Sequence, residues 1–480
     1  MRKFNFLLAS AVLGTGLSFT SCSEDEVDGR IQTKTDDVPE AAVQANGFYV
    51  VNEDWFGHDN GSLNYFKQDN ATSYTPSYRV YRAANDNETL GTTSQFGAIW
   101  GDNIYVMSKQ GNRLVVADAK TLRKKAVLME IGGDGRSFVG IDDKKAYVSH
   151  SAGVAVLDLA TMQIAKQIDG VSGQIGMMCC MAGRVFAVSQ NNGLYVINAQ
   201  TDELEQTISG TYYTLACSKD GSVWVAGSTG LTCIDPATLQ QTETMAYPDG
   251  ASIASSWGAW NAGGLCASTQ SNVIYWTTGG NWSQSKLYKY DIDAKAGKML
   301  YEFGKSENDK QMEFYGAGVR VDPLTDELVL TATQSGWGAN YSYNWIYKFD
   351  AAGNEITHFE YFGDNGTSGA SGAADGRYFW FPALPVFEDA NKPQILLNQV
   401  MLKPGEEKEI DLEEKVIDYD NTFASMRLEV SDDASNATLK IDGHVLTVTA
   451  GASEGVSTCK LSVVSNGVRV EKTVEIAVQQ

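Results

Sequence analysis

Short runs of alternating apolar and polar residues recur along most of the chain, and they repeat as a unit of four predicted strands. One clear copy begins at Phe96-Gly-Ala-Ile-Trp100 and continues through 104–108 and 113–118 to a fourth run at 124–131. Polar turns such as Gly101-Asp-Asn103 separate the runs. A four-strand unit that recurs along the chain is typical of a β-propeller, in which each copy forms one blade.

The end of the third strand marks the copies, because this run repeatedly closes on Asp or Asn, which can cap the following turn through its side chain. The marker falls at Asp118, Asp158, Asn198, Asp235, Asp291 and Asp350. A seventh copy opens the chain with strands at 48–51 and 63–66, but it lacks an innermost strand. We expect that strand at 378–386, where it would close the ring. The pattern favours seven blades, with six or eight as alternatives.

The pattern changes near Pro393, where glycine becomes sparse and the alternation sharpens. Runs with this alternation lie at 408–412, 426–430, 438–441, 445–449, 460–464 and 470–478. About seven short strands separated by turns predict an Ig-like β-sandwich. The predicted fold is therefore all-β: a seven-bladed β-propeller followed by a C-terminal Ig-like sandwich.

The N-terminus has the pattern of a lipoprotein signal peptide. Arg2 and Lys3 precede an apolar run at 6–17 that is too short to span a bilayer, and small residues lead to Cys22. Cys22 is therefore the predicted lipidation site. Ser23-Glu-Asp-Glu26 resembles the acidic signal that sends Bacteroidota lipoproteins to the outer face of the outer membrane; a plain acidic linker in the periplasm is the alternative.

These patterns divide the chain into four predicted parts. Residues 1–21 form the signal peptide, residues 22–44 a lipidated flexible tether, residues 45–391 the propeller and residues 392–480 the sandwich. The tether is expected to be flexible because it is polar and has no periodicity.

Charge and cysteine content narrow the function classes. The formal net charge of −22 disfavours nucleic acid and anionic lipid head groups as partners, so the membrane is expected to contact the protein only through its lipid anchor. The six cysteines after Cys22 have no metal-ligand spacing and mostly sit in apolar strands, which favours buried thiols over disulfides.

The connections between strands predict a binding face. Connections from strand two to three, and from strand four to the next strand one, lie on one face of a propeller. Here they are rich in aromatic and amide residues, whereas the turns of the opposite face contain no tryptophan. Rigid rings supply contact area and amides supply hydrogen bonds without charge, although single rings could instead pack between blades. The predicted ligand-binding residues are Trp55, Phe56, His58, Asp59, Gln95, Lys109, Gln110, Arg136, His150, Gln174, Gln190, Asn191, Tyr212, Tyr213, Trp257, Trp282, Tyr315, Trp337 and Tyr341.

No motif predicts catalysis or an intrinsic cofactor. The four histidines fall on different elements, and Gly451-Ala-Ser-Glu-Gly455 fits a nucleophile motif without its strand–elbow–helix context. Asp418 and Asp420 are a calcium candidate with little support, so no metal site is predicted. An enzyme would need a converging carboxylate pair, for which the acidic stretch Glu53, Asp54 and Asp59 is the one source on this face. We therefore predict a non-enzymatic binding protein.

Residues 52–66 (Asn-Glu-Asp-Trp-Phe-Gly-His-Asp-Asn-Gly-Ser-Leu-Asn-Tyr-Phe) are similar to the opening segment of a family of Bacteroidota surface propellers. That family includes cobalamin-capture lipoproteins that sit beside the TonB-dependent vitamin B12 transporter of the outer membrane. The resemblance covers roughly residues 45–390. It implies a propeller that holds cobalamin on its loop face and passes it to the transporter. The C-terminal sandwich departs from the shorter capture proteins, which end after the propeller.

Two ligand classes stay open at this stage. Cobalamin, or a related corrinoid, is a large amide-fringed molecule with an apolar rim, which suits a wide surface of rings and amides. Its binding would depend on pH if His58 or His150 reached the cobalt. A glycan is the alternative, because tryptophan and tyrosine also stack on sugar rings.

Overall fold

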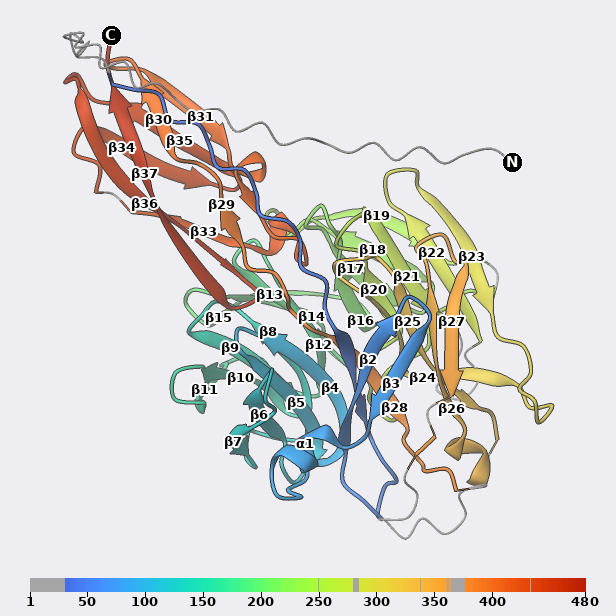
Figure 1. Ribbon diagram of the computed structural model, residues 1–480. Helices are drawn as coiled ribbons and strands as arrows, with labels where there is room; N and C mark the ends of the chain where they lie inside the picture. Colours follow the sequence, from blue (N-terminus) through green and yellow to red (C-terminus); the bar gives the residue numbers. More distant parts are fainter. Residues whose placement is uncertain are drawn as a thin grey trace, which may run out of the picture.

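The computed structural model describes residues 31–248, 250–278, 285–336, 338–360, 362–363, 376–431 and 433–480. Within these ranges the propeller consists of seven four-stranded antiparallel sheets, as predicted. The innermost strands of successive sheets contact one another in a closed ring. The C-terminal sandwich stands on one face of this ring (Figure 1).

The blades are named here from the innermost strand outward. Blade one contains β28 (Pro382–Phe387), β1 (Gly47–Asn52), β2 (Ser62–Asn70) and β3 (Ser73–Ser77). Blade two contains β4 (Thr92–Trp100), β5 (Asn103–Gln110), β6 (Leu114–Asp118) and β7 (Lys124–Leu128). Blade three contains β8 (Gly135–Gly140), β9 (Lys145–His150), β10 (Gly153–Asp158) and β11 (Gln163–Gln167). Blades four and five are β12 (Ile175–Met181), β13 (Arg184–Ser189), β14 (Gly193–Asn198) and β15 (Glu203–Ile208); and β16 (Tyr212–Cys217), β17 (Val223–Gly227), β18 (Gly230–Ile234) and β19 (Gln241–Ala246). Blades six and seven are β20 (Leu265–Ala267), β21 (Val273–Thr277), β22 (Lys286–Asp291) and β23 (Ala296–Glu302); and β24 (Met312–Val321), β25 (Leu328–Gln334), β26 (Asn344–Phe349) and β27 (Glu355–Glu360). Two short helices, α1 (Val80–Ala84) and η1 (Gly338–Ser342), lie in connections.

The ring is closed by β28, which pairs with β1 and supplies the innermost strand of the first blade. The predicted closing strand, 378–386, begins too early. Phe381 has a left-handed backbone (φ 48°), which interrupts the extended ladder, so the strand starts at Pro382. The preceding segment instead accepts backbone hydrogen bonds from Glu53 and Asp54 at 3.0 and 3.1 Å. The start and end of the propeller are thus joined by a sheet and by the loop beside it.

The Asp markers at the ends of third strands cap turns, as the sequence predicts. In the second blade, Asp118 accepts hydrogen bonds from the backbone N–H of Lys120 (3.2 Å) and Thr121 (2.9 Å). Asp158 in blade three and Asp235 in blade five repeat this arrangement. The hydrogen bonds from Thr121 lower the pKa of Asp118 to about 2, so the cap is ionised at neutral pH.

The C-terminal domain is a two-sheet sandwich. One sheet contains β30 (Gln399–Leu402), β37 (Val468–Val478), β36 (Gly455–Ser465) and β33 (Arg427–Val430), and the other contains β31 (Glu407–Asp411), β35 (Val445–Ala450) and β34 (Ala437–Asp442). The short strands β29 (Gln394–Ile395) and β32 (Val416–Ile417) and the helical turns η2 (Leu412–Glu414) and η3 (Phe423–Ser425) complete it. Its core is apolar, with Leu446, Leu461 and Ile476 fully buried. Gly455 opens β36, so the Gly451–Gly455 motif lacks a nucleophile elbow.

The sandwich docks on the propeller face formed by the turns between strands one and two and between strands three and four, which we call the turn face. The backbone N–H of Gly101 donates to the carbonyl of Asn466 at 2.6 Å, and Gln270 donates to the carbonyl of Tyr419 at 2.9 Å. Arg427 of β33 forms a 2.9 Å ion pair with Asp142. The opposite face, which we call the loop face, is left free by the sandwich.

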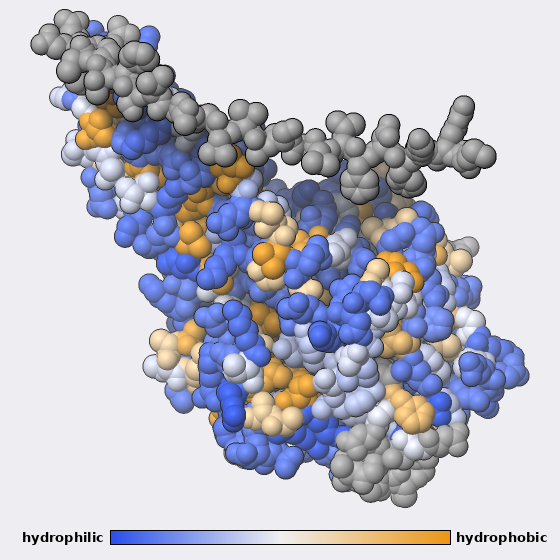
Figure 2. All heavy atoms as spheres, in the orientation of Figure 1, coloured by the Kyte–Doolittle hydropathy of each residue, from blue (hydrophilic) through white to orange (hydrophobic). Residues whose placement is uncertain are grey.

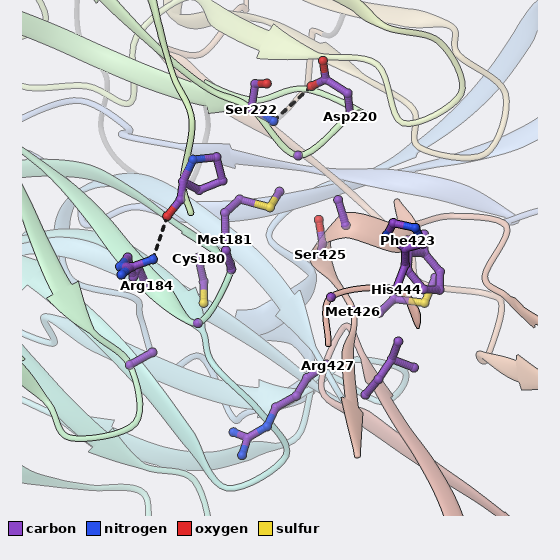
Figure 3. Close-up of a pocket in the computed structure, with 18 of the residues that line it drawn as sticks. Cys180, Met181, Arg184, Asp220, Ser222, Phe423, Ser425, Met426, Arg427 and His444 are labelled. Atoms are coloured by element: carbon purple, nitrogen blue, oxygen red, sulfur yellow. Dashed lines mark hydrogen bonds between the residues drawn. The ribbon is translucent and has the colours of Figure 1, made fainter. Parts of the chain in front are cut away.

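A cavity of about 900 Å³ separates parts of the two domains on the turn face (Figure 3). Blade four contributes Cys180, Met181 and Arg184 to its wall, and the sandwich contributes Phe423 and His444. The outer surface around this junction is mainly hydrophilic in the view of Figure 2. The cavity is therefore a gap in the docking interface rather than part of the loop face.

The described part of the predicted tether, residues 31–44, is not free chain. It runs extended along the sandwich (Figure 1). There the backbone N–H of Ile31 donates to the side-chain oxygen of Gln479 at 2.8 Å, and Asp37 pairs with Lys472 at 2.7 Å. The backbone N–H of Lys34 donates to Gln399 at 2.7 Å. This segment lacks a periodic pattern because its hydrogen bonds go to amide side chains of the sandwich rather than to a strand ladder. Cys22 lies outside the described residues.

Two further observations complete the fold. The cysteines from Cys179 to Cys459 are free thiols, as predicted, and Cys233, Cys266 and Cys459 are buried. No helix among the described residues has the length and apolar character needed to cross a membrane.

Candidate functional site

The loop-face end of the propeller axis collects polar side chains from several blades. Each innermost strand begins at this face, because it follows the connection from the preceding blade. Gln95 lies near the start of β4, Arg136 near the start of β8, and Gln174 directly before β12. Lys109 lies near the end of β5, which reaches the same face. The sequence therefore brings these predicted residues toward one axis through the propeller repeat itself.

Glu53 lies at the centre of one group of these polar side chains. The side-chain amide of Gln95 donates to its carboxylate at 2.8 Å, the hydroxyl of Tyr315 also hydrogen-bonds to it, and Lys109 provides a nearby positive charge. Burial raises the pKa of Glu53, and the charge of Lys109 opposes that shift. Glu53 was predicted on this face as part of an acidic stretch, but it was not among the predicted ligand-binding residues. Its position in the connection between strands two and three was the signal that could have identified it.

Arg136 lies at the centre of a second group, and only 6% of this residue is exposed. One terminal nitrogen donates to Gln174 at 3.1 Å, and the guanidinium lies 5.4 Å from the ring centre of Trp260. Its Nε and Nη1 are buried and have no hydrogen-bond partner among the described residues. Burial lowers the pKa of Arg136, and burial together with the charge of Arg136 lowers the pKa of Lys109.

Aromatic rings line the rim beside Glu53. The rings of Tyr315 and Tyr341 lie 5.3 and 5.6 Å from that of Phe381, and Trp55 lies 4.8 Å from Phe379. Tyr341 is buried, whereas Tyr315 and Phe381 are partly exposed. Phe381 was expected inside a strand, and its left-handed backbone instead places it among the rim aromatics.

Trp257 and Trp260, which the structure describes on this face, do not form an exposed platform. Trp257 is 9% and Trp260 2% exposed, and the indole N–H of Trp257 donates to the backbone carbonyl of Tyr212 at 2.9 Å. Both rings pack on Gly176, where a Cβ would lie 2.8 Å from Trp260 and 3.0 Å from Trp257. The interpretation that single rings pack between blades therefore holds for Trp257. Trp282 and Trp337 lie outside the described residues.

The first loop contributes a small exposed surface. Trp55 and His58 stack with their ring centres 3.5 Å apart, and Phe56 is 70% exposed. Asp59 was predicted in the same group, but it faces inward. It forms a bidentate pair with Arg82 (2.7 and 3.1 Å) and accepts from the hydroxyl of Tyr378. Asp59 therefore joins the loop to α1 rather than facing a ligand.

His150 is also turned away from the face, contrary to the prediction. It is 2% exposed, its Nδ1 accepts from the backbone N–H of Ala152 at 3.2 Å, and its Nε2 contacts Gln167 at 2.8 Å. Both ring nitrogens are thus used within blade three. Burial lowers the pKa of His150, which keeps the ring neutral at neutral pH.

The remaining predicted residues lie at the rim with differing exposure. Gln110 and Asn191 are exposed, whereas Gln190, Tyr212 and Tyr213 are partly buried. Glu313 was not predicted, although it lies near the start of β24, the position that Gln95 and Arg136 hold in their blades. It is 2% exposed, and burial raises its pKa to about 7. Across the described ranges, no group of three His, Cys, Asp or Glu side chains is arranged to hold a metal ion.

Comparison with known proteins places the propeller in a family. A family described as a domain of unknown function, DUF5074, matches residues 46–388. The chain belongs to this family. The DUF5074 match spans the propeller from β1 to just past β28 and leaves out the sandwich.

Two solved structures were compared with the DUF5074 propeller. A quinonprotein alcohol dehydrogenase-like protein from Bacteroides thetaiotaomicron is 14% identical, with 72% of this chain and 78% of that chain covered and a TM-score of 0.51. A hydrazine synthase from Kuenenia stuttgartiensis is 14% identical, with 52% and 75% covered and a TM-score of 0.42. No curated protein matches the chain. The likeness to the Bacteroides protein supports the fold alone.

Proposed function

We propose that this protein is a surface lipoprotein whose DUF5074 propeller captures cobalamin, or a related corrinoid, on the loop face and passes it to a TonB-dependent transporter. The observation that carries the proposal is the division of the two faces. The turn face is occupied by the sandwich, while the loop face gathers polar groups and rings around the axis. A wide, free, mixed polar and aromatic face suits one large ligand.

The chemistry of the rim fits an amide-fringed ligand. Exposed Gln110 and Asn191 and half-buried Gln190 supply neutral donors and acceptors, and Tyr315 and Phe381 supply partly exposed rings. Neutral amides can pair with a ligand's amides without the desolvation cost of a charge. Aromatic rings then cover the ligand's apolar edge.

We propose binding without catalysis, because the acidic residues of the stretch 53–59 are separated. Glu53 turns to Gln95 and Lys109, whereas Asp54 accepts from Ser62 at 2.7 Å inside the blade. Asp59 is paired with Arg82. A glycosidase-type mechanism requires two carboxyl groups that face one substrate, and this stretch does not supply them.

The path of the N-terminal segment supports display of the loop face away from the membrane. Ile31 contacts Gln479, beyond the end of β37, at the part of the sandwich remote from the propeller (Figure 1). Cys22 precedes Ile31 by nine residues, which span at most about 30 Å when extended. With Cys22 lipidated, the sandwich stands between the membrane and the propeller. Transfer of ligand to a transporter then requires the propeller to turn toward it.

Calorimetric titration of the soluble chain, residues 23–480, with cyanocobalamin tests the proposal. We expect a saturable one-to-one complex and co-elution of the red ligand with the protein. Tyr315→Ala and Phe381→Ala should each weaken binding at least about tenfold, the effect of losing a central aromatic contact. Phe423→Ala, in the cavity of the turn face, is the control and should bind like the wild type.

Two outcomes would overturn this assignment. Loss of binding in Phe423→Ala but not in the rim variants would move the ligand to the interdomain cavity. Absence of corrinoid binding, together with retention on a polysaccharide matrix, would favour a glycan-binding surface, for which the exposed Phe56 ring beside the Trp55–His58 stack is the specific observation.

A further inference from the structure

Arg136 is a buried cation that contacts no anionic side chain in the part of the chain that the structure describes. It is 6% exposed, and its Nε and Nη1 have no acceptor among the described residues. Among the described residues, its side chain donates a hydrogen bond to the neutral amide of Gln174. A desolvated guanidinium is costly unless a carboxylate or another anion compensates it.

Other arginines of the propeller show how the chain treats this group elsewhere. Arg82 is paired with Asp59 through two hydrogen bonds. Arg320 donates to the backbone carbonyls of Gly263 and Val319 at 3.2 and 2.7 Å. Arg136 has neither arrangement: it has no bidentate carboxylate and no backbone carbonyl as acceptor among the described residues, and two of its buried nitrogens lack a hydrogen-bond partner there.

The surroundings make this point electropositive within an acidic protein. Lys109 is a second cation, on which the charge of Glu53 and the charge of Arg136 act in opposite directions. Asp134 acts on both cations through its charge but contacts neither. Glu53 is engaged by Gln95 and Tyr315. The ring of Trp260 lies beside the guanidinium and limits its movement. A fixed positive site in a chain of net charge −22 favours an anionic group of a ligand.

We infer that Arg136, supported by Lys109 and Gln174, is an anion subsite that binds a phosphate group of the captured ligand. The planar guanidinium offers parallel N–H groups that match two oxygens of a phosphate, which a lysine ammonium does not. This inference rests on the proposed corrinoid capture. It specifies the ligand form: cobalamin carries a phosphodiester in its nucleotide loop, whereas cobinamide lacks that loop and its phosphate.

The test compares cyanocobalamin with dicyanocobinamide on the wild type and on Arg136→Gln, by calorimetry at one salt concentration. We expect Arg136→Gln to raise the Kd for cyanocobalamin at least tenfold and to change the Kd for dicyanocobinamide less than twofold. Arg136→Lys should recover only part of the loss. Arg184→Gln, which removes an arginine paired with Glu205 on the turn-face side of blade four, is the matched control and should change neither Kd.

The outcomes separate this inference from the proposed function. If Arg136→Gln weakens both corrinoids equally, or neither, phosphate recognition is overturned while corrinoid capture stands. If the wild type binds neither corrinoid, the proposed function fails, and inorganic phosphate then decides the inference. Thermal midpoints are measured with millimolar phosphate and, at the same ionic strength, with chloride. A rise with phosphate in the wild type that is lost in Arg136→Gln supports the anion subsite. The absence of any rise in the wild type overturns it. Arg136→Gln should keep its own thermal midpoint, because it loses a desolvated charge.

Discussion

Arg469 of sandwich strand β37 holds Asp143 of the propeller through hydrogen bonds of 2.9 and 3.0 Å to its two carboxylate oxygens. The same guanidinium reaches Glu429 on β33 at 2.9 Å. Both side chains of the Arg469–Asp143 pair are less than a quarter exposed. The hydrogen bonds from Arg469 lower the pKa of Asp143, so the pair is charged at neutral pH. The pair fixes the sandwich to the first turn of blade three.

Removal of this pair should loosen the two domains. We expect Asp143→Ala to lower the free energy of unfolding of the docked form by about 1 kcal/mol. A partly buried bidentate ion pair stabilises a protein more than an exposed ion pair does. A double-mutant cycle with Arg469→Met, followed by calorimetric unfolding, measures the coupling. Additive effects of the two substitutions would show that the pair contributes nothing to docking, and corrinoid affinity should stay constant throughout.

A group of buried carboxyls lies where the propeller passes into the sandwich. Asp420 accepts from the backbone N–H groups of Ala390 and Asn391 at 3.2 and 3.1 Å. Asp389 and Asp418 lie beside it. Burial, reinforced by the charge of Asp420, raises the pKa of Asp389 to about 8, and burial raises that of Asp418 to about 7. The joint between the domains therefore holds protons that the unfolded chain would release.

This proton binding gives a stability profile with a definite sign. Because the folded pKa values lie above the unfolded value of 3.8, unfolding becomes easier as pH rises from about 4 to about 8. We expect Asp418→Asn to raise the free energy of unfolding at pH 8 by at least about 1 kcal/mol, since each pKa unit corresponds to about 1.4 kcal/mol. Thermal unfolding at pH 4.5, 6 and 8 should show the gain growing with pH. A gain of equal size at every pH would contradict this origin.

The propeller could be predicted because its determinants are local and repeated. Alternation of apolar residues sets each strand, and an Asp such as Asp118 or Asp158 caps the turn that follows within three residues. Such interactions are readable from short stretches of sequence. The same rule placed Gln95, Lys109 and Arg136 on one face, because a residue's position within its repeat determines the end of the blade it occupies.

The predictions that were wrong concern residues whose partners come from another strand, blade or domain. Trp257 is buried because Gly176, in another blade, leaves room for it. The segment at 31–44 is held by residues such as Gln399 and Lys472, more than 350 positions later. His150 was assigned to the ligand face by its place in a loop, but Gln167 from the next hairpin turns it inward. Repeat position predicts the face of a residue but not its side-chain partners.

Asp59 should act on stability and not directly on ligand contact. It is paired with Arg82, and both side chains are 15% exposed. Asp59→Ala removes the bidentate partner of Arg82 and leaves Asp54, 3.7 Å away, as its other carboxylate. Breaking a buried pair in this way costs about 3 kcal/mol. Urea unfolding should show this loss. Asp102→Asn, at an exposed position on the turn face, is the control and should change stability by less than about 0.5 kcal/mol. A stable Asp59→Ala protein with weakened corrinoid binding would return Asp59 to the ligand face.

His150 and His58 should differ in the same experiment. His150→Ala removes a buried ring that donates to Gln167, so it should cost about 2 kcal/mol of stability and leave corrinoid affinity unchanged. Burial holds the folded pKa of His150 below the usual 6.5, so the unfolded chain takes up the proton first as pH falls. The stability that His150 contributes is therefore present above pH 6.5 and is lost at lower pH, and His150→Ala should flatten that part of the profile.

His58→Ala, at an exposed ring stacked on Trp55, should leave stability nearly unchanged. Thermal unfolding between pH 5 and 8, with corrinoid titrations at both ends, measures each effect; weaker corrinoid binding in His150→Ala at unchanged stability would show that the ring reaches the ligand after all.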